Sequence, residues 1–266
     1  MKIVFWSPSA GKCKTTSAMV SIVSQAAIKY SKKCAIVITN HKEKIQSMFF
    51  SDSSVENLED SASSFGTGAL LRDAKSGMLS PTSVQNASIN LTDRLSVFIS
   101  DSTTDPKIVK RSWESSYTDI ANALDNAYDL VFIDTEAGSS QLNQAVLMSA
   151  DILVICLNQN RLLCEKVFDG SKYDFSKQKC LFLLNDYDSK IGYTDYTLIR
   201  SFKHVNNKNL AVLRHSSDFA AAINKNSVLK WVASIQKAKR SSSAYAYAKD
   251  LEKATDKLFT LLNIPI

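Results

Sequence analysis

A lysine and two threonines stand together near the start of the sequence. Lys14, Thr15 and Thr16 follow SPSAGKC at residues 7–13, a segment rich in turn-forming residues. In a phosphate-binding loop, backbone N–H groups and a helix N-terminus point at the anion, and a lysine reaches the β- and γ-phosphates. A hydroxyl on the next residue holds Mg²⁺. These residue types predict a phosphate loop; the alternative is an ordinary strand-to-helix turn with a lysine in the first helical turn.

Both glycines of the usual phosphate-loop pattern are replaced here. The pattern G-x-x-x-x-G-K-[ST] would cover residues 8–15, and Pro8 and Cys13 stand at its two glycine positions. The glycine before the lysine lets the backbone approach the phosphates in conformations that a side chain resists. We therefore expect Cys13 to restrict the loop and to weaken nucleotide binding without abolishing it.

Short apolar runs alternate with longer amphipathic stretches along the whole chain. The first run, KIVFW at residues 2–6, precedes the turn, and residues 15–30 have the apolar spacing of a helix. Further strands are predicted at residues 34–38, 95–100, 130–134, 152–157 and 180–184, with a weaker one at 209–213. Nearly continuous apolar strands are typical of a sheet that is covered on both faces. The alternation predicts a three-layer α/β sandwich with a mostly parallel central sheet.

Composition agrees with one folded domain over residues 1–266. Of the 266 residues, 45% are hydrophobic and 22% are charged, which excludes a disordered chain. No apolar run approaches the roughly 20 residues that a membrane-spanning helix needs. The net charge of +6 permits an anionic partner without requiring one.

The five cysteines form no C-x-x-C pair, and the three histidines are dispersed. Metal-ligand spacing is therefore absent, and buried apolar roles in a reduced compartment are expected for the cysteines. Because the first apolar run is too short for a secretory signal, we predict a cytoplasmic protein.

The sequence resembles the ParA/MinD group of P-loop ATPases. SPSAGKCKTTSAMV at residues 7–20 is similar to that group's deviant loop, K-G-G-x-G-K-T-T, and its W-S-P start is similar to the TadZ/CpaE branch, which is linked to pilus assembly. The resemblance continues in the right order along nearly the whole chain, at DLVFIDTEAG (129–138), ADILVICLN (150–158), CLFLLND (180–186) and HSSDFAAAINKNSVL (215–229).

This resemblance implies a P-loop NTPase fold and a site for ATP or ADP with Mg²⁺. Lys14 matches the loop lysine, Thr15 the Mg²⁺ hydroxyl ligand, and Thr16 the hydroxyl that faces the α-phosphate. Asp134 matches the Walker B aspartate, and Asn185 matches the asparagine that contacts adenine. The loop residues carried over as nucleotide-binding are Ser9, Ala10, Gly11, Lys12, Cys13, Lys14, Thr15 and Thr16.

The departures from the group concern hydrolysis. The signature lysine falls on Ser9, and the acidic pair after the second strand falls on Thr39 and His41. Losing a cation at the transferred phosphate and a carboxylate near the water is expected to cut catalysis by orders of magnitude. Lys12 and Glu136 are weak candidates for catalytic substitutes; solvated surface charges are the alternative for both.

The resemblance implies a nucleotide-dependent switch that positions or assembles a partner complex, with weak or lost hydrolysis. A homodimer and a protein partner in a membrane-associated assembly, at the inner membrane face, are further expectations. A scaffold that binds no nucleotide and a competent ATPase that uses Lys12 or Glu136 are the alternatives. Contact with nucleic acid through residues 225–257, where basic side chains outnumber acidic ones, is less favoured than these possibilities.

Two helical stretches could serve partners instead of the core. We expect a helix at the centre of residues 66–79. It could form a surface for a partner, but a helix that covers the protein's own core is favoured. For the helix over residues 248–262, packing onto the sheet is favoured over membrane binding, because its polar face carries both signs of charge.

Overall fold

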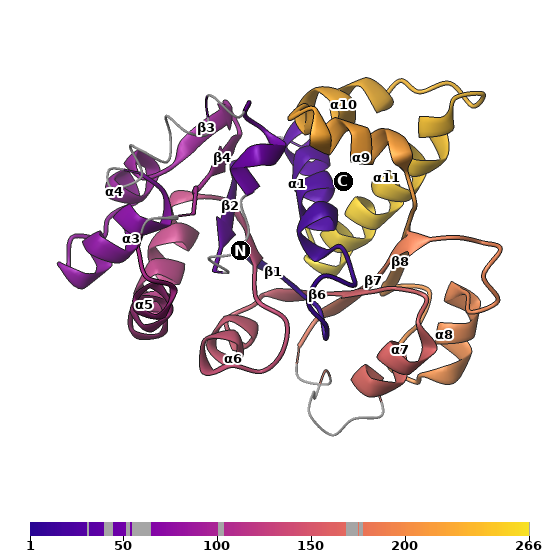
Figure 1. The fold of residues 1–266 in the computed structure, drawn as a ribbon, viewed down its shortest axis with the longest axis horizontal. Helices are drawn as coiled ribbons and strands as arrows, with labels where there is room; N and C mark the ends of the chain where they lie inside the picture. Colours follow the sequence, from indigo (N-terminus) through magenta and orange to yellow (C-terminus); the bar gives the residue numbers. More distant parts are fainter. Residues whose placement is uncertain are drawn as a thin grey trace.

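The computed structural model describes residues 1–30, 32–39, 45–51, 54, 65–100, 104–168, 175 and 178–265. Within these ranges an eight-stranded sheet runs through the centre of the molecule, in the order β3-β4-β2-β5-β1-β6-β7-β8 (Figure 1). The pairs are parallel except for β3 with β4. The strands are β1 (Lys2–Trp6), β2 (Cys34–Ile38), β3 (Ile89–Thr92), β4 (Leu95–Val97), β5 (Leu130–Asp134), β6 (Ile152–Leu157), β7 (Cys180–Tyr187) and β8 (Leu210–Arg214).

Helices cover both faces of this sheet. One layer holds α1 (Thr15–Lys29), α9 (Ser217–Asn224), α10 (Val228–Ile235) and α11 (Ser243–Leu261). The other holds α5 (Pro106–Ala127), α6 (Gln141–Met148), α7 (Arg161–Phe168) and α8 (Asp195–Ser201), and α3 (Gly66–Lys75) and α4 (Pro81–Asn86) pack against α5. A short 3₁₀ helix, η1, spans Ile45–Met48. The predicted three-layer sandwich with a mostly parallel sheet is therefore confirmed.

The core lies in the middle strands, as their apolar runs require. Every residue of β2, β5 and β6 is buried, and Phe5 and Phe132 face each other across β1 and β5 with ring centroids 6.3 Å apart. Burying such side chains contributes about 1.5–3 kcal/mol each. The core therefore fixes the register of the central strands, and with it the positions of the loops at their carboxyl ends.

Three features of the sheet differ from the sequence prediction. The strand expected at residues 95–100 ends at Val97, and β7 continues three residues beyond Leu184 to Tyr187. An additional edge strand, β3, lies antiparallel to β4. Its four residues alternate between half-buried and exposed, because only one face of this edge packs on the protein.

Both helices that could have served partners pack on the protein. α3 begins at Gly66 and buries Leu70 against the core, next to α5. α11 buries Leu251, Ala254 and Leu258 and contacts β8. The expectation that the C-terminal helix packs onto the sheet is confirmed. In the described part of the chain, no helix combines the length and the apolar character that crossing a membrane requires.

Candidate functional site

The loop between β1 and α1 lies at the carboxyl edge of the sheet, next to the ends of β6 and β7. The Nδ2 amide of Asn158 donates to the backbone oxygen of Lys12 at 3.0 Å, and that of Asn185 donates to the backbone oxygen of Cys13 at 2.7 Å. Both asparagines follow apolar strand residues, so the packing of the sheet places them. The loop, Asp134 and Asn185 meet at one edge, as parallel strands predict.

Thr16 joins the first turn of α1 to the end of β5. Its hydroxyl donates a hydrogen bond to Oδ2 of Asp134, whose side chain is almost fully buried. The side chain of Thr15 lies beside the Cys156 thiol instead. By resemblance, Thr15 is the hydroxyl that shares Mg²⁺ with Asp134; in the structure, Thr16 is the hydroxyl in contact with that carboxylate. A carboxylate and a hydroxyl at one point form an oxygen donor set that suits Mg²⁺.

Backbone strain in the loop falls on the lysine. Lys14 adopts the left-handed conformation, with φ 49° and ψ 41°, and it directly precedes the first residue of α1. Within the loop, all of which is described, the other positive φ is at Gly11. Cys13 itself has no positive φ, and the weakening of nucleotide binding expected from its side chain stays a prediction. Cys13 is buried, and burial raises the pKa of its thiol to about 11, although Lys12 acts in the opposite direction.

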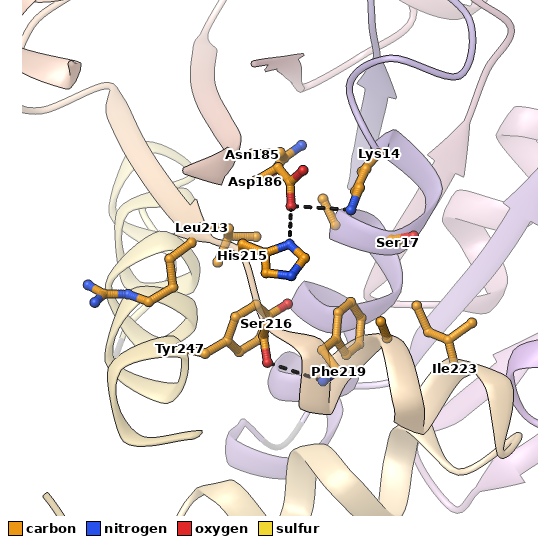
Figure 2. Close-up of a pocket in the computed structure, with 13 residues that line it drawn as sticks. Lys14, Ser17, Asn185, Asp186, Leu213, His215, Ser216, Phe219, Ile223 and Tyr247 are labelled. Atoms are coloured by element: carbon orange, nitrogen blue, oxygen red, sulfur yellow. Dashed lines mark hydrogen bonds and ion pairs between the residues drawn. The ribbon is translucent and has the colours of Figure 1, made fainter. Parts of the chain in front are cut away.

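The ammonium of Lys14 contacts a carboxylate that sequence reasoning missed. Its Nζ lies 3.2 Å from Oδ1 of Asp186, and Nδ1 of His215 lies 2.7 Å from the same oxygen. Figure 2 shows both side chains pointing at Asp186. The sequence did contain a signal: Asp186 and His215 stand at or just after the ends of neighbouring parallel strands, and such ends share one edge of the sheet.

Two cavities meet at Lys14. The first is lined by the loop and the end of β5, including Ala10, Gly11, Thr16 and Asp134. The second lies between α1, β7 and α9, and its walls include Asn185, Asp186, His215, Phe219 and Tyr247 (Figure 2). Oδ1 of Asn185 is buried and finds no hydrogen-bond partner among the described residues. An unpaired buried acceptor costs about 1–3 kcal/mol. The Asn185 side chain also lies beside the Cys156 thiol.

The remaining predicted residues take less part in the two cavities. Lys12 is exposed and Glu136 is half-buried, and neither lines the described walls of these two cavities. Ser9 is half-buried, and its backbone oxygen accepts a hydrogen bond from Ser7. Thr39 donates its hydroxyl to the backbone oxygen of Asp134 at 3.2 Å, while His41 lies outside the described residues.

A mostly parallel sheet covered by helices on both faces, with a loop and helix after a central strand, defines the doubly wound α/β class of folds. No protein-family model and no curated protein matches the sequence. Solved structures do match, and through them the fold is identified as that of the ParA/MinD ATPases.

A ParA family ATPase from Chlorobium tepidum is 13% identical over 96% of this chain and 98% of its own, with a TM-score of 0.72. A plasmid partition protein from Borrelia burgdorferi, bound to AMPPNP, is 16% identical over 97% and 98%, with a TM-score of 0.65. A chain of the MinC:MinD cell division complex from Aquifex aeolicus is 12% identical over 98% and 96%, with a TM-score of 0.63. At these identities, the likeness is one of fold.

Proposed function

We propose that this protein binds ATP or ADP with Mg²⁺ at the loop between β1 and α1. The observation that carries the proposal is the contact of Thr16 with Asp134 beneath a loop that leads directly into the N-terminus of α1. Such a helix end favours anions, because its first N–H groups lack partners within the helix. The Borrelia protein of the same fold, solved with AMPPNP, supports the proposal.

Each part of the site has a matching task. The backbone of residues 9–16 and the Lys14 ammonium would hold the phosphates. Asp134, together with the hydroxyl of Thr15 or Thr16, would hold Mg²⁺. The side-chain oxygen of Asn185 suits the amino group of adenine, and Phe219 and Tyr247 add apolar wall to the same cavity. When bound, Mg²⁺ supplies charge neutralisation for the phosphates.

We propose further that hydrolysis is weak and that the protein is a switch. Ser9 offers no cation, and Thr39 offers a hydroxyl where the family has a carboxylate. Neither Lys12 nor Glu136 lines the two cavities. In phosphoryl transfer, the protein contributes mainly positioning and charge stabilisation, and these positions lack the charges. The nucleotide state would then control a partner instead of driving metabolic turnover.

The partner side of the proposal is a homodimer that acts on another protein. The MinC:MinD complex supports the protein partner, since a chain of the same fold is found there in a complex of two proteins. The W-S-P start of the loop directs the proposal toward pilus or secretion machinery, at the cytoplasmic face of a membrane.

One observation favours a second function, a scaffold that binds partners without nucleotide. Lys14, the cation assigned to the phosphates, is already paired with Asp186. A lysine satisfied within the protein no longer requires an anionic ligand.

Calorimetry with Mg-ADP and Mg-ATP distinguishes the two functions. We expect saturable binding to the wild type and at least tenfold weaker binding to Lys14→Ala, because a charge-assisted contact is lost. Lys190→Ala is the matched control, since Lys190 is exposed and lies outside both cavities. A folded wild type that binds neither nucleotide at millimolar concentration would leave the scaffold as the function.

A further inference from the structure

One oxygen of Asp186 receives two nitrogen groups from different parts of the chain. Lys14 Nζ lies 3.2 Å and His215 Nδ1 lies 2.7 Å from Oδ1 (Figure 2). Lys14 precedes α1, Asp186 lies near the end of β7, and His215 follows β8. Three elements therefore direct two donors and one acceptor to a single point, between the two cavities that meet at Lys14.

The backbone at this point is held in an uncommon conformation. Lys14 has φ 49° and Asp186 has φ 56°, and β7 changes its register with β8 between Asn185 and Tyr187. Left-handed conformations at residues other than glycine cost about 1–2 kcal/mol and persist where the surroundings hold them. Both partners of the ion pair are strained, so their juxtaposition is built by the fold.

The carboxylate at this point is charged and can be displaced. Partial burial acts to raise the pKa of Asp186, but hydrogen bonds from His215 and Lys14 outweigh it and hold that pKa below its usual range. The side chains of Lys14, Asp186 and His215 are 53%, 41% and 59% exposed. Exposed ion pairs are weak, so a ligand with more negative charge can replace the carboxylate at the two donors.

We propose that Lys14 and His215 form a two-donor site for one phosphate oxygen of the nucleotide, and that Asp186 fills it until the nucleotide arrives. The inference rests on the proposed function and adds to it a second phosphate-binding residue, His215, and an internal competitor, Asp186. Binding requires the carboxylate to leave Lys14. Asp186 therefore lowers the affinity of the site for nucleotide, and His215 raises it.

The direction in which each substitution changes nucleotide affinity distinguishes a two-donor site from a purely structural cluster. If the three side chains only held the loop together, replacing Asp186 or His215 would loosen the same contacts and weaken nucleotide binding in both cases. A competitor and a ligand-binding donor instead change affinity in opposite directions. Asp186→Asn removes the charge and keeps a residue type that tolerates the left-handed conformation. His215→Gln removes the ring nitrogen that contacts Asp186 and keeps a polar side chain.

The test is calorimetry of Mg-ADP binding to four variants and the wild type. We expect about tenfold tighter binding to Asp186→Asn and about tenfold weaker binding to His215→Gln, as charge-assisted contacts of this kind allow. Asp188→Asn and His204→Gln are matched controls with unchanged affinity. Both residues are exposed and outside the two cavities.

Each outcome decides between the proposals. If wild type binds Mg-ADP and Asp186→Asn binds no tighter, or His215→Gln binds no weaker, the two-donor site is wrong and nucleotide binding stands. If only Asp186→Asn binds, the nucleotide function of the wild type fails and so does the two-donor site, because the carboxylate then blocks the site instead of giving way to the nucleotide. If no folded protein in the set binds Mg-ADP, the nucleotide function fails, and the two-donor site fails with it.

Discussion

The hydroxyl of Thr16 donates to the carboxylate of Asp134, although 118 positions separate the two residues. This contact ties the first turn of α1 to the end of β5, across the strand pair β1 and β5. Thr15 precedes Thr16 by one residue, and its side chain lies instead beside Cys156 on β6. On a helix, neighbouring residues point in directions about 100° apart, so only one of the two threonines can face Asp134.

This division of roles predicts different effects of two similar substitutions. Thr16→Val removes a hydrogen bond to a buried carboxylate and should lower the free energy of unfolding by about 1–3 kcal/mol. Thr15→Val should cost less than about 1 kcal/mol, since no charged group loses a partner. Urea unfolding of both variants measures the difference. Equal losses, or a larger loss for Thr15→Val, would contradict the contact.

The same pair of variants reports on Mg²⁺. If the hydroxyl beside Asp134 is the metal ligand, Thr16→Val should lose about tenfold or more of the preference for Mg-ADP over metal-free ADP. Thr15→Val should keep that preference. The reverse pattern would restore the assignment of Thr15 that the sequence resemblance implies.

The left-handed backbone at Lys14 predicts that glycine is better tolerated there than alanine. Lys14→Gly and Lys14→Ala both lose the ammonium, so both should lose nucleotide binding equally. Glycine adopts φ 49° freely, whereas alanine does not. We expect Lys14→Gly to be more stable than Lys14→Ala by about 1 kcal/mol in urea unfolding. A less stable glycine variant would place the strain elsewhere in the loop.

The sequence predicted the parts of the fold that depend on burial. β1, β2, β5 and β6 are continuous apolar runs, and their observed bounds match the predicted ones because both faces of the sheet are covered. β3 was missed, since INLT is a short edge segment with few apolar residues and its pairing depends on β4. Edge strands of this kind are determined by a neighbour far more than by their own pattern.

The sequence predicted the general location of the site but not the contacts within it. Parallel topology brings the loop, Asp134 and Asn185 to one edge, and the sequence showed this. It did not show which threonine meets Asp134, because that depends on the residue at which α1 begins. Nor did it show Asp186 meeting Lys14 and His215, because that contact needs the left-handed turn at the end of β7.

Two glycines with positive φ offer a matched test of packing at the start of α3. At Gly66, with φ 72°, an added Cβ would lie 2.2 Å from the backbone oxygen of Ile99, so Gly66→Ala combines strain with a collision. At Gly77, with φ 66°, no atom lies within 4 Å of such a Cβ. We expect a loss of about 1–2 kcal/mol for Gly77→Ala, from backbone strain alone, and more than about 3 kcal/mol for Gly66→Ala. Chemical denaturation of both variants measures this, and similar losses would show that the two sites are equally open.

Burial of Cys13 predicts a thiol that reacts slowly despite its place in the loop. With a pKa raised to about 11, only about one molecule in a thousand carries the reactive thiolate at pH 8. Labelling by iodoacetamide, followed by mass spectrometry of the peptide that contains Cys13, should therefore be slow at pH 8. Its rate should rise about tenfold per pH unit as the pH approaches 11.

The same protein unfolded in urea is the control and should label rapidly at pH 8. Rapid labelling of the folded protein at pH 8, at the rate of the unfolded control, would mean that the loop opens and exposes the thiol.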